Sequence, residues 1–179
     1  MPLATLSLGA NLPSPAGPPD VTLAAALHRL ASVGKVIASS ALYSTAPVGF
    51  TSQPRFLNAA VTLETLHSPL SLLSSLLEIE LAFGRDRLFA IPDGPRTLDL
   101  DLVLYDDFVL SLYGLELPHP RFAQRAFVLI PLNEVAPRLH DPRSGRTVAE
   151  ILEAFRRTTE PLDSSVVPIE SPHWPAHQS

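Results

Sequence analysis

The sequence contains no cysteine and only one lysine, Lys35, among its 179 residues. The lack of cysteine excludes disulfides, thiolate metal ligands and thiol nucleophiles, and it is compatible with a cytoplasmic protein. No apolar run approaches the length of a membrane span, and the first residues do not resemble a signal peptide, so we expect no membrane association. The formal net charge of −5 gives no basic field for nucleic acid.

Hydrophobic residues make up 46% of the chain, which is enough for one well-filled core. We therefore predict one domain over residues 1–157 and expect it to be a monomer. Residues 158–179 are rich in proline and serine and show no periodicity. We predict that this tail is loosely docked or disordered.

The hydrophobic pattern predicts strands and helices in a simple order. Asp20 is expected to cap a helix that Gly34 closes, and Ser68 followed by Pro69 begins a second helix that ends at Gly84. The strands are expected over 5–9, 36–43, 56–64 and 96–105, followed by a hairpin over 108–117, a helical turn over 119–124, and helices over 127–135 and 147–157. This order predicts an α+β protein with a ferredoxin-like βαββαβ core. Its antiparallel sheet should carry helices on both faces, with the two long helices on the same face.

The stretch 96–105 is the most informative strand because its two faces differ in chemistry. One face is apolar and should pack on the long helices, whereas the other carries two aspartates about 6.5–7 Å apart at their Cα atoms. Such a pair suits Mg²⁺, although a solvated strand end or pairing with arginines is also compatible with it. The apolar face consists of Leu98, Leu100, Leu102 and Leu104, and the other of Asp99, Asp101, Val103 and Tyr105.

Further polar and aromatic residues are expected beside the two aspartates. Arginines next to a carboxylate pair suggest a polyphosphate ligand, and aromatic rings with an amide suggest a flat heterocycle. The sequence has no Walker-type glycine loop and no GxGxxG motif, so the nucleotide site must be an unusual one. Together these features point to phosphoryl transfer onto a heterocycle, although each aromatic residue alone could be plain core. The residues are Phe56, Asn58, Arg85, Arg87, Arg96, His119, Arg121, Arg125 and Phe127.

Glu80 stands out because it projects into the apolar side of the helix predicted over 68–84. A carboxylate in that place must be paired, protonated or directed into a site. A local salt bridge to Arg85 or Arg87 is the alternative to a functional role.

Several blocks of the sequence, in order, resemble one family, the 6-hydroxymethyl-7,8-dihydropterin pyrophosphokinases of folate biosynthesis. The resemblance runs from about Thr5 to Pro137. Its blocks are Leu6-Ser7-Leu8-Gly9-Ala10-Asn11-Leu12, Tyr43-Ser44-Thr45-Ala46-Pro47, Gln53-Pro54-Arg55-Phe56-Leu57-Asn58, Gly84-Arg85-Asp86-Arg87, Gly94-Pro95-Arg96-Thr97-Leu98-Asp99-Leu100-Asp101, Pro118-His119-Pro120-Arg121 and Arg125-Ala126-Phe127.

The resemblance implies a function and a set of roles. The family transfers pyrophosphate from ATP to the hydroxymethyl group of the pterin and releases AMP, with two Mg²⁺ ions. The partners that this implies are the two small-molecule substrates, ATP and the hydroxymethyl-dihydropterin. By resemblance, Asp99 and Asp101 are metal ligands and, with Arg85 and Arg96, catalytic residues. The ATP-binding positions are Glu80, Arg87, His119, Arg121 and Arg125. The pterin-binding positions are Thr45, Pro47, Phe56, Asn58 and Phe127.

The sequence also departs from the family pattern. Ile91-Pro92-Asp93 stands where the catalytic loop usually carries an Arg-Trp pair, so a lid that stacks through tryptophan is not expected. Leu77 and Glu116 stand where polar contacts to adenine are common. We still expect Arg85 and Arg96 on a loop that closes over ATP.

Two other interpretations of the sequence stay open. A palm-like nucleotidyl cyclase or polymerase also has a ferredoxin-like sheet with paired aspartates, but the basic nucleic-acid track and second catalytic hairpin of that class are not seen here. A ligand-sensing module without catalytic activity is the other. In such a module Asp99 and Asp101 would be solvated charges.

Overall fold

An antiparallel β-sheet forms the centre of the protein in the computed structural model, which describes residues 1–89, 91–158 and 165–175. Its main strand order is β5 (Asp99–Tyr105), β1 (Leu3–Ala10), β4 (Phe56–Glu64), β3 (Leu42–Thr45) and β8 (Val166–Ile169). β2 (Lys35–Ser39) also pairs with β4, and every pairing in the sheet is antiparallel. The predicted ferredoxin-like arrangement is confirmed.

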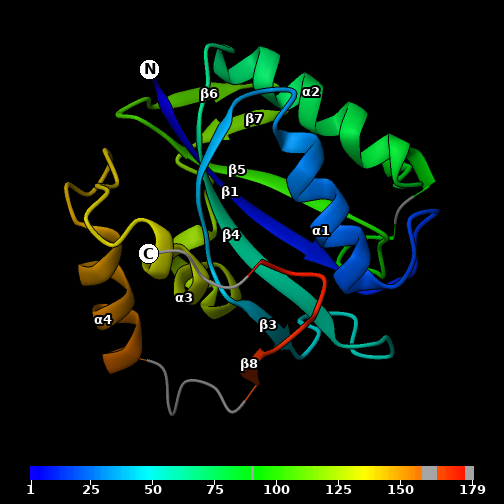
Figure 1. Ribbon diagram of the computed structural model, residues 1–179. Coiled ribbons are helices and arrows are strands. Elements are labelled where there is room, and N and C mark those ends of the chain that lie inside the picture. The colour runs from blue at the N-terminus through cyan, green and yellow to red at the C-terminus, as the bar shows by residue number, and fades with distance from the viewer. Residues whose placement is uncertain (90, 159–164, 176–179) are drawn as a thin grey trace.

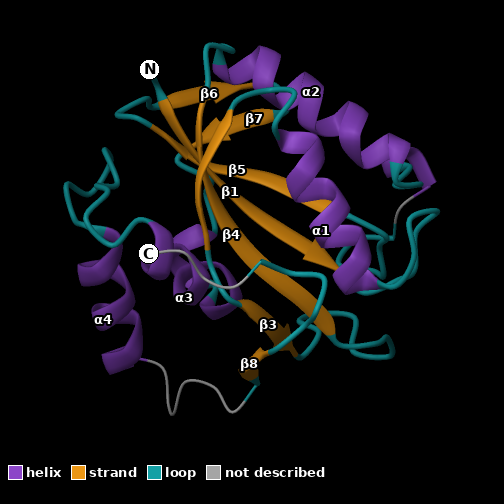
Figure 2. Cartoon of the chain, viewed as in Figure 1, coloured by secondary structure: helices purple, strands orange, loops and turns teal. Residues whose placement is uncertain are grey.

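Helices cover both faces of this sheet, as predicted (Figures 1 and 2). α1 (Pro19–Leu30) and α2 (Pro69–Ala82) pack on one face, and α3 (Ala126–Val135) and α4 (Val148–Thr158) lie on the other. Apolar side chains are therefore buried in two clusters, one on each side of the sheet. The remaining elements are the hairpin of β6 (Leu110–Leu112) and β7 (Leu115–Leu117) and two 3-10 turns, η1 (Arg87–Phe89) and η2 (Phe122–Gln124).

The two long helices begin in different ways. The Ser68 hydroxyl accepts a hydrogen bond from the Ser71 amide at 3.3 Å, which confirms the predicted cap of α2. The predicted limits of α1 are wrong, because α1 begins at Pro19, has Asp20 inside its first turn, and ends at Leu30. Gly34 comes after the helix, where a Cβ atom would lie 2.4 Å from the Glu64 carbonyl oxygen. Gly34 therefore allows close packing of two backbones rather than closing the helix.

The predicted strand over 36–43 is two strands. Ser40 and Ala41 separate β2 from β3. Ser40 still makes two hydrogen bonds to Ala60 of the neighbouring strand β4. Its backbone amide donates to the Ala60 carbonyl, and its hydroxyl accepts from the Ala60 amide, both at 2.9 Å. The hydrophobic pattern of the sequence does not reveal this break between the two strands, because Ser40 is buried as a strand residue would be.

A β-bulge changes the predicted faces of β5. Leu98, Leu100 and Leu102 belong to the cluster under α1 and α2, as expected. The register between β1 and β5 shifts between Thr5 and Leu6, which face Leu104 and Leu102. The extra residue reverses the alternation. Leu104 therefore packs with α3 and α4, and Tyr105 lies on the α1 and α2 side, so the prediction for these two residues is wrong.

The described part of the tail is not loose. β8 pairs with β3, and Trp174 is 7% exposed within the cluster under α1. This corrects the predicted tail for residues 165–175, whereas residues 159–164 and 176–179 lie outside the described part of the chain.

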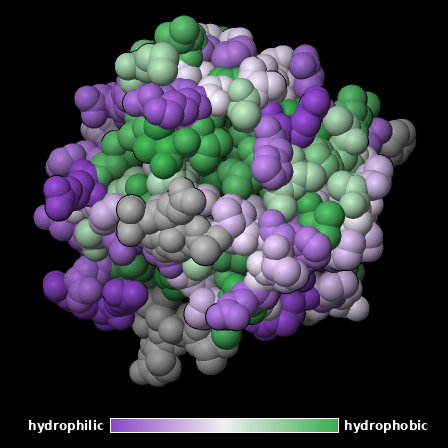
Figure 3. All heavy atoms as spheres, in the orientation of Figure 1, coloured by the Kyte–Doolittle hydropathy of each residue, from purple (hydrophilic) through white to green (hydrophobic). Residues whose placement is uncertain are grey.

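The surface leaves some apolar side chains exposed. Leu112 is 48% exposed and Tyr113 fully exposed at the tip of the β6–β7 hairpin. The face drawn in Figure 3 has a hydrophobic area at its upper left, bordered by hydrophilic residues. None of the helices within the described ranges is long and apolar enough to span a membrane.

Candidate active site

A cavity of about 220 Å³ lies on the face of the sheet opposite α1 and α2. Alternation along β4 and β5 places the polar residues there, because Ala59, Val61, Leu100 and Leu102 occupy the core side. The residues predicted to share this face, Phe56, Asn58, Asp99 and Asp101, do line one cavity there, while their functional roles stay a prediction. The cavity is lined by Thr45, Phe56, Asn58, Arg96, Asp99, Asp101, Arg121, Arg125 and Phe127, together with residues that were not predicted.

Asp99 is the centre of a group of arginines. Its Oδ1 lies 3.5 Å from Arg87 Nη2 and 3.9 Å from Arg85 Nη2, and its Oδ2 lies 3.4 Å from Arg96 Nε. Burial nevertheless raises the pKa of Asp99, helped by the charge of Asp101, even though the arginines act in the opposite direction. The predicted pairing of the carboxylates with arginines is thus found for Asp99.

The negative charge of Asp101 has fewer nearby positive charges than that of Asp99. No arginine of the described chain lies within 4 Å of its carboxylate. Burial raises the pKa of Asp101, and the charge of Glu80 adds to the effect of burial while Arg87 opposes it. A half-buried carboxylate pair with this deficit of positive charge suits a divalent cation.

Asp101 also borders a second cavity of about 350 Å³. The residues that line this second cavity include two basic ones, Arg87 and His119, and three leucines, Leu73, Leu112 and Leu115. Burial, followed by the charges of Arg125 and Arg121, lowers the pKa of His119. The Arg121 amide donates to His119 Nδ1 at 3.2 Å, so a neutral ring carries its proton on Nε2. Asp101 thus lines both cavities, whereas Asp99 lines only the first.

Glu80 joins α2, β5 and Arg87. Its Oε1 accepts from the Leu100 amide and from Arg87 Nη2, and its Oε2 accepts from Arg87 Nε, each at 2.7 Å. The side chain is 1% exposed. The predicted local salt bridge is therefore confirmed, with Arg87 as its partner. Contact of Glu80 with ATP stays a prediction.

Two aromatic rings flank the first cavity, each with an arginine over it. The Arg96 guanidinium carbon lies 4.8 Å from the centre of the Phe56 ring, and that of Arg125 lies 5.4 Å from the centre of the Phe127 ring. Phe56 is buried, whereas Phe127 is partly exposed and packs on the α3–α4 cluster. Each ring therefore lines the cavity and also packs against the interior of the protein.

The amide of Asn58 is fixed by its neighbours. Its Nδ2 donates to Thr45 Oγ1 at 2.6 Å, and both side chains are buried. A Cβ atom at Gly9 would lie 3.0 Å from Asn58 Oδ1, so the glycine leaves room for this amide. Pro47 lies in the loop between Ala46 and Val48, which line the cavity, but is not itself among the lining residues.

A hydrogen-bond network that was not predicted holds the loops around the cavity. Asn11 Nδ2 donates to Gln53 Oε1 at 2.9 Å and to the Pro54 carbonyl at 3.0 Å, and its Oδ1 accepts from the Arg96 amide at 2.8 Å. Gln53 Nε2 donates to the Asp93 carbonyl at 2.8 Å. Asp93 belongs to the stretch that departs from the family pattern, so this stretch is tied to its surroundings through its backbone. The only feature of the sequence that pointed to Asn11 and Gln53 was that each lies in one of the blocks that resemble the family.

The fold and the site define a class: α+β proteins of ferredoxin-like topology whose sheet presents two aspartates to a cavity, one of them contacted by arginines and the other also lining a second cavity. Comparison with known proteins identifies the family within this class. A model of the family described as 7,8-dihydro-6-hydroxymethylpterin-pyrophosphokinase (HPPK) matches residues 5–137. The chain belongs to this family, and the resemblance found in the sequence is confirmed.

Individual relatives agree. The chain is 43% identical over 152 residues to a 2-amino-4-hydroxy-6-hydroxymethyldihydropteridine pyrophosphokinase of Synechocystis, covering 84% of this chain and 74% of that protein. It is 42% identical to the protein of the same name from Pseudomonas aeruginosa, covering 83% and 89%. The crystal structure of Plasmodium falciparum HPPK-DHPS is similar in fold, with a TM-score of 0.71, 16% identity, and coverage of 92% of this chain. The chain spans about half of that structure's length, 47%.

Proposed function

We propose that this protein transfers pyrophosphate from ATP to 6-hydroxymethyl-7,8-dihydropterin in folate biosynthesis, giving the pterin diphosphate and AMP. The observation that carries the proposal is the position of Asp99 and Asp101, which line the cavity with aromatic walls, while Asp101 also lines the cavity with Arg87 and His119. A group can pass between two ligands only where their sites meet. We infer that the pterin occupies the first cavity and ATP the second.

Asp99 and Asp101 would hold two Mg²⁺ ions. Among the described residues, no group of three or more His, Asp or Glu could hold a metal by itself. A pair of carboxylates nevertheless fits Mg²⁺, because this ion is commonly bound by one or two carboxylates together with substrate phosphates. When bound, the metal offsets negative charge on the phosphates. The deficit of positive charge beside Asp101 supports this assignment.

The chain's own residues would orient the substrates. Phe56 and Phe127 stack on the pterin, and Thr45 and Pro47 complete the wall of its site, while Asn58 reads the polar edge of the ring. Arg85 and Arg96 carry buried Nε atoms that make no hydrogen bond within the described chain, and Arg96 Nε has only its 3.4 Å ion-pair contact with Asp99, so both guanidinium groups could bind an anion as well. Arg87 and His119 line the ATP cavity, and Glu80 positions ATP through Arg87. Arg121 and Arg125 line the first cavity and would bind the ATP phosphates from that side.

The chemistry is a displacement at the β-phosphorus. The pterin hydroxyl oxygen forms a bond to that phosphorus, and the bond between the β-phosphorus and the oxygen bridging it to the α-phosphorus breaks, so AMP leaves. The hydroxyl proton can pass to Asp99. We assign no dedicated general base. We propose further that the protein acts as a cytoplasmic monomer.

Identification of the nucleotide product tests the proposal. The protein is incubated with ATP, Mg²⁺ and 6-hydroxymethyl-7,8-dihydropterin, and nucleotides are separated by chromatography. We expect AMP in equal amount to pterin diphosphate, and none when the pterin or Mg²⁺ is omitted. Formation of ADP, or no product from folded protein, would contradict the proposal.

A further inference from the structure

The C-terminal segment 165–175 lies outside the part matched by the family model, yet it contacts the strand that carries the wall of the first cavity. β8 pairs with β3 so that Val166 faces Thr45 and Ile169 faces Leu42. The pairing continues past β3, because the Ala46 amide donates to the Ser165 carbonyl at 3.3 Å. Without β8, the outer edge of β3 would lack these backbone partners.

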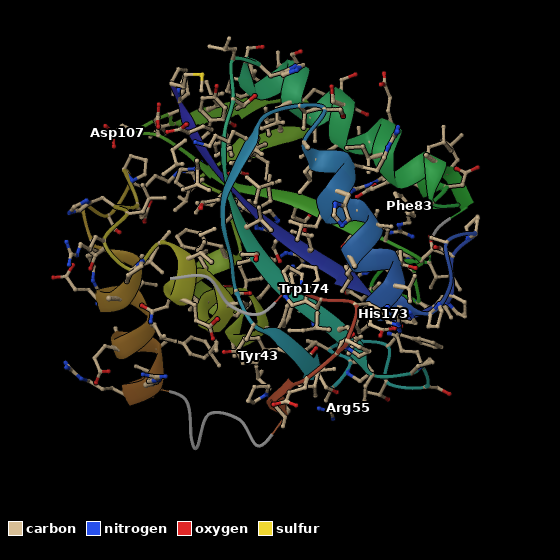
Figure 4. The ribbon with its side chains drawn as sticks, in the orientation of Figure 1. Tyr43, Arg55, Phe83, Asp107, His173 and Trp174 are labelled. Carbon is tan, nitrogen blue, oxygen red and sulfur yellow. The ribbon has the colours of Figure 1, made fainter. Side chains whose placement is uncertain are left out.

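Arg55 joins the beginning of this segment to the cavity wall. Its Nε donates to Ser44 Oγ at 2.9 Å, and its Nη2 donates to the Ser44 carbonyl at 3.1 Å and to the Ser165 carbonyl at 2.7 Å. Arg55 directly precedes Phe56, which flanks the cavity. One exposed guanidinium, labelled in Figure 4, therefore links β3 and the residue before β8 to the start of β4.

Trp174 anchors the other end of the segment. Its indole Nε1 donates to the Ser40 carbonyl at 2.8 Å, at the break between β2 and β3, and its ring is 7% exposed in the core under α1. Ser171 adds a hydrogen bond to Asp20 Oδ2 of 2.9 Å. Figure 4 shows Trp174 lying inward among the elements of the core, whereas Arg55 lies at the lower end of the sheet.

Arg55 and Trp174 thus hold the segment 165–175 against β3, and the last residue of β3, Thr45, positions the side-chain amide of Asn58. Thr45 ends β3, and its hydroxyl accepts the Asn58 amide at 2.6 Å. We propose that the segment 165–175 positions the pterin wall of the site, and that Arg55 and Trp174 are the positioning residues through which it acts. Neither is among the residues lining the cavity. The assignment of the ligand as a pterin rests on the proposed function.

Two variants of the full-length protein test this inference. Arg55→Met removes the guanidinium, and Trp174→Phe keeps an aromatic ring but removes the indole N–H. We expect the dissociation constant for 6-hydroxymethyl-7,8-dihydropterin to rise about tenfold in each, equivalent to ~1.4 kcal/mol. The affinity for a non-hydrolysable ATP analogue with Mg²⁺ should change by less than about twofold.

Matched controls lie on α4. Arg156→Met removes another exposed arginine, and Phe155→Leu makes a conservative change at a partly buried ring that packs on the outside of the other core cluster. Both controls should keep the pterin affinity of the unchanged protein. Unchanged pterin affinity in folded Arg55→Met and Trp174→Phe, or an equal loss for both ligands, would overturn the inference.

Hydrogen exchange without any ligand separates this inference from the proposed function. Amides of residues 42–48 should exchange faster in Arg55→Met and Trp174→Phe than in the unchanged protein and the two controls. Equal exchange would overturn the inference. If the unchanged protein binds no pterin and forms no AMP, the proposed function fails, while the exchange result still decides whether the segment fixes this strand.

Discussion

At the scale of single residues, the site depends on two carboxylates that the protein buries at a cost. Burial raises the pKa of both Asp99 and Asp101, and each residue's pKa is raised further by a neighbouring carboxylate. A carboxyl with a higher pKa in the folded state favours folding below its unfolded pKa of about 3.9, and this contribution is lost as the pH rises through the folded pKa. At neutral pH the pair therefore destabilises the ligand-free protein.

Asp101→Asn tests this cost. In metal-free buffer at pH 7.5 we expect the melting temperature to rise by about 2–4 °C, corresponding to ~1 kcal/mol, and the gain to shrink near pH 4. Turnover with Mg²⁺ should fall more than about a hundredfold, because loss of a metal ligand should cost more than loss of its hydrogen-bonded neighbours. Circular dichroism melts and an AMP assay provide the measurements.

The exposed Asp107 supplies the control for that variant. Asp107→Asn should leave both melting temperature and turnover unchanged. Near-normal turnover of Asp101→Asn would show that this carboxylate is not needed for the reaction, and a lower melting temperature at pH 7.5 would contradict the electrostatic cost.

At the scale of elements, one buried carboxylate connects α2 to β5. Glu80 accepts the Leu100 amide, in the strand of the acidic pair, and pairs with Arg87 through both oxygens. Helix α2 therefore sets the position of β5 and of the arginine beside Asp99 at the same time. A carboxylate so placed has a structural role regardless of any contact with ATP.

Glu80→Gln should lower the free energy of unfolding by about 2–3 kcal/mol, since the buried end of the ion pair with Arg87 loses its charge and Arg87 keeps only the longer 3.5 Å contact with Asp99. That corresponds to a fall of about 4–12 °C in melting temperature. Glu153→Gln on α4 is the matched control, because its ion pair with Arg157 at 3.7 Å is exposed and should contribute less than about 0.5 kcal/mol. Equal melting temperatures for the two variants would contradict the structural role of Glu80.

At the scale of the whole molecule, Asp101 lines both cavities, so binding of metal and nucleotide should be coupled. The carboxylates lack a third acidic or histidine ligand in the described chain, and the phosphates of ATP would complete the coordination. Mg²⁺ alone should therefore bind weakly.

Thermal unfolding measures this coupling. Mg-ATP at about 100 times its dissociation constant should stabilise the protein by ~2.7 kcal/mol, or about 5–11 °C. Mg²⁺ alone, or ATP with EDTA, should give a much smaller shift, and Asp99→Ala should abolish most of the response to Mg-ATP. A shift by ATP that survives EDTA would show that nucleotide binding needs no metal, as in the sensor interpretation.

The sequence by itself determined most of the elements up to α4, their order and the polar face of β4 and β5, because hydrophobic periodicity reports which side of each element is buried. The motif blocks also determined the family. Tertiary structure alone decided which arginine pairs with Glu80, where the bulge reverses Leu104 and Tyr105, and how β8 and Trp174 close the edge of β3. These depend on contacts between residues far apart in the chain, and no local pattern encodes which of several equivalent partners comes within reach.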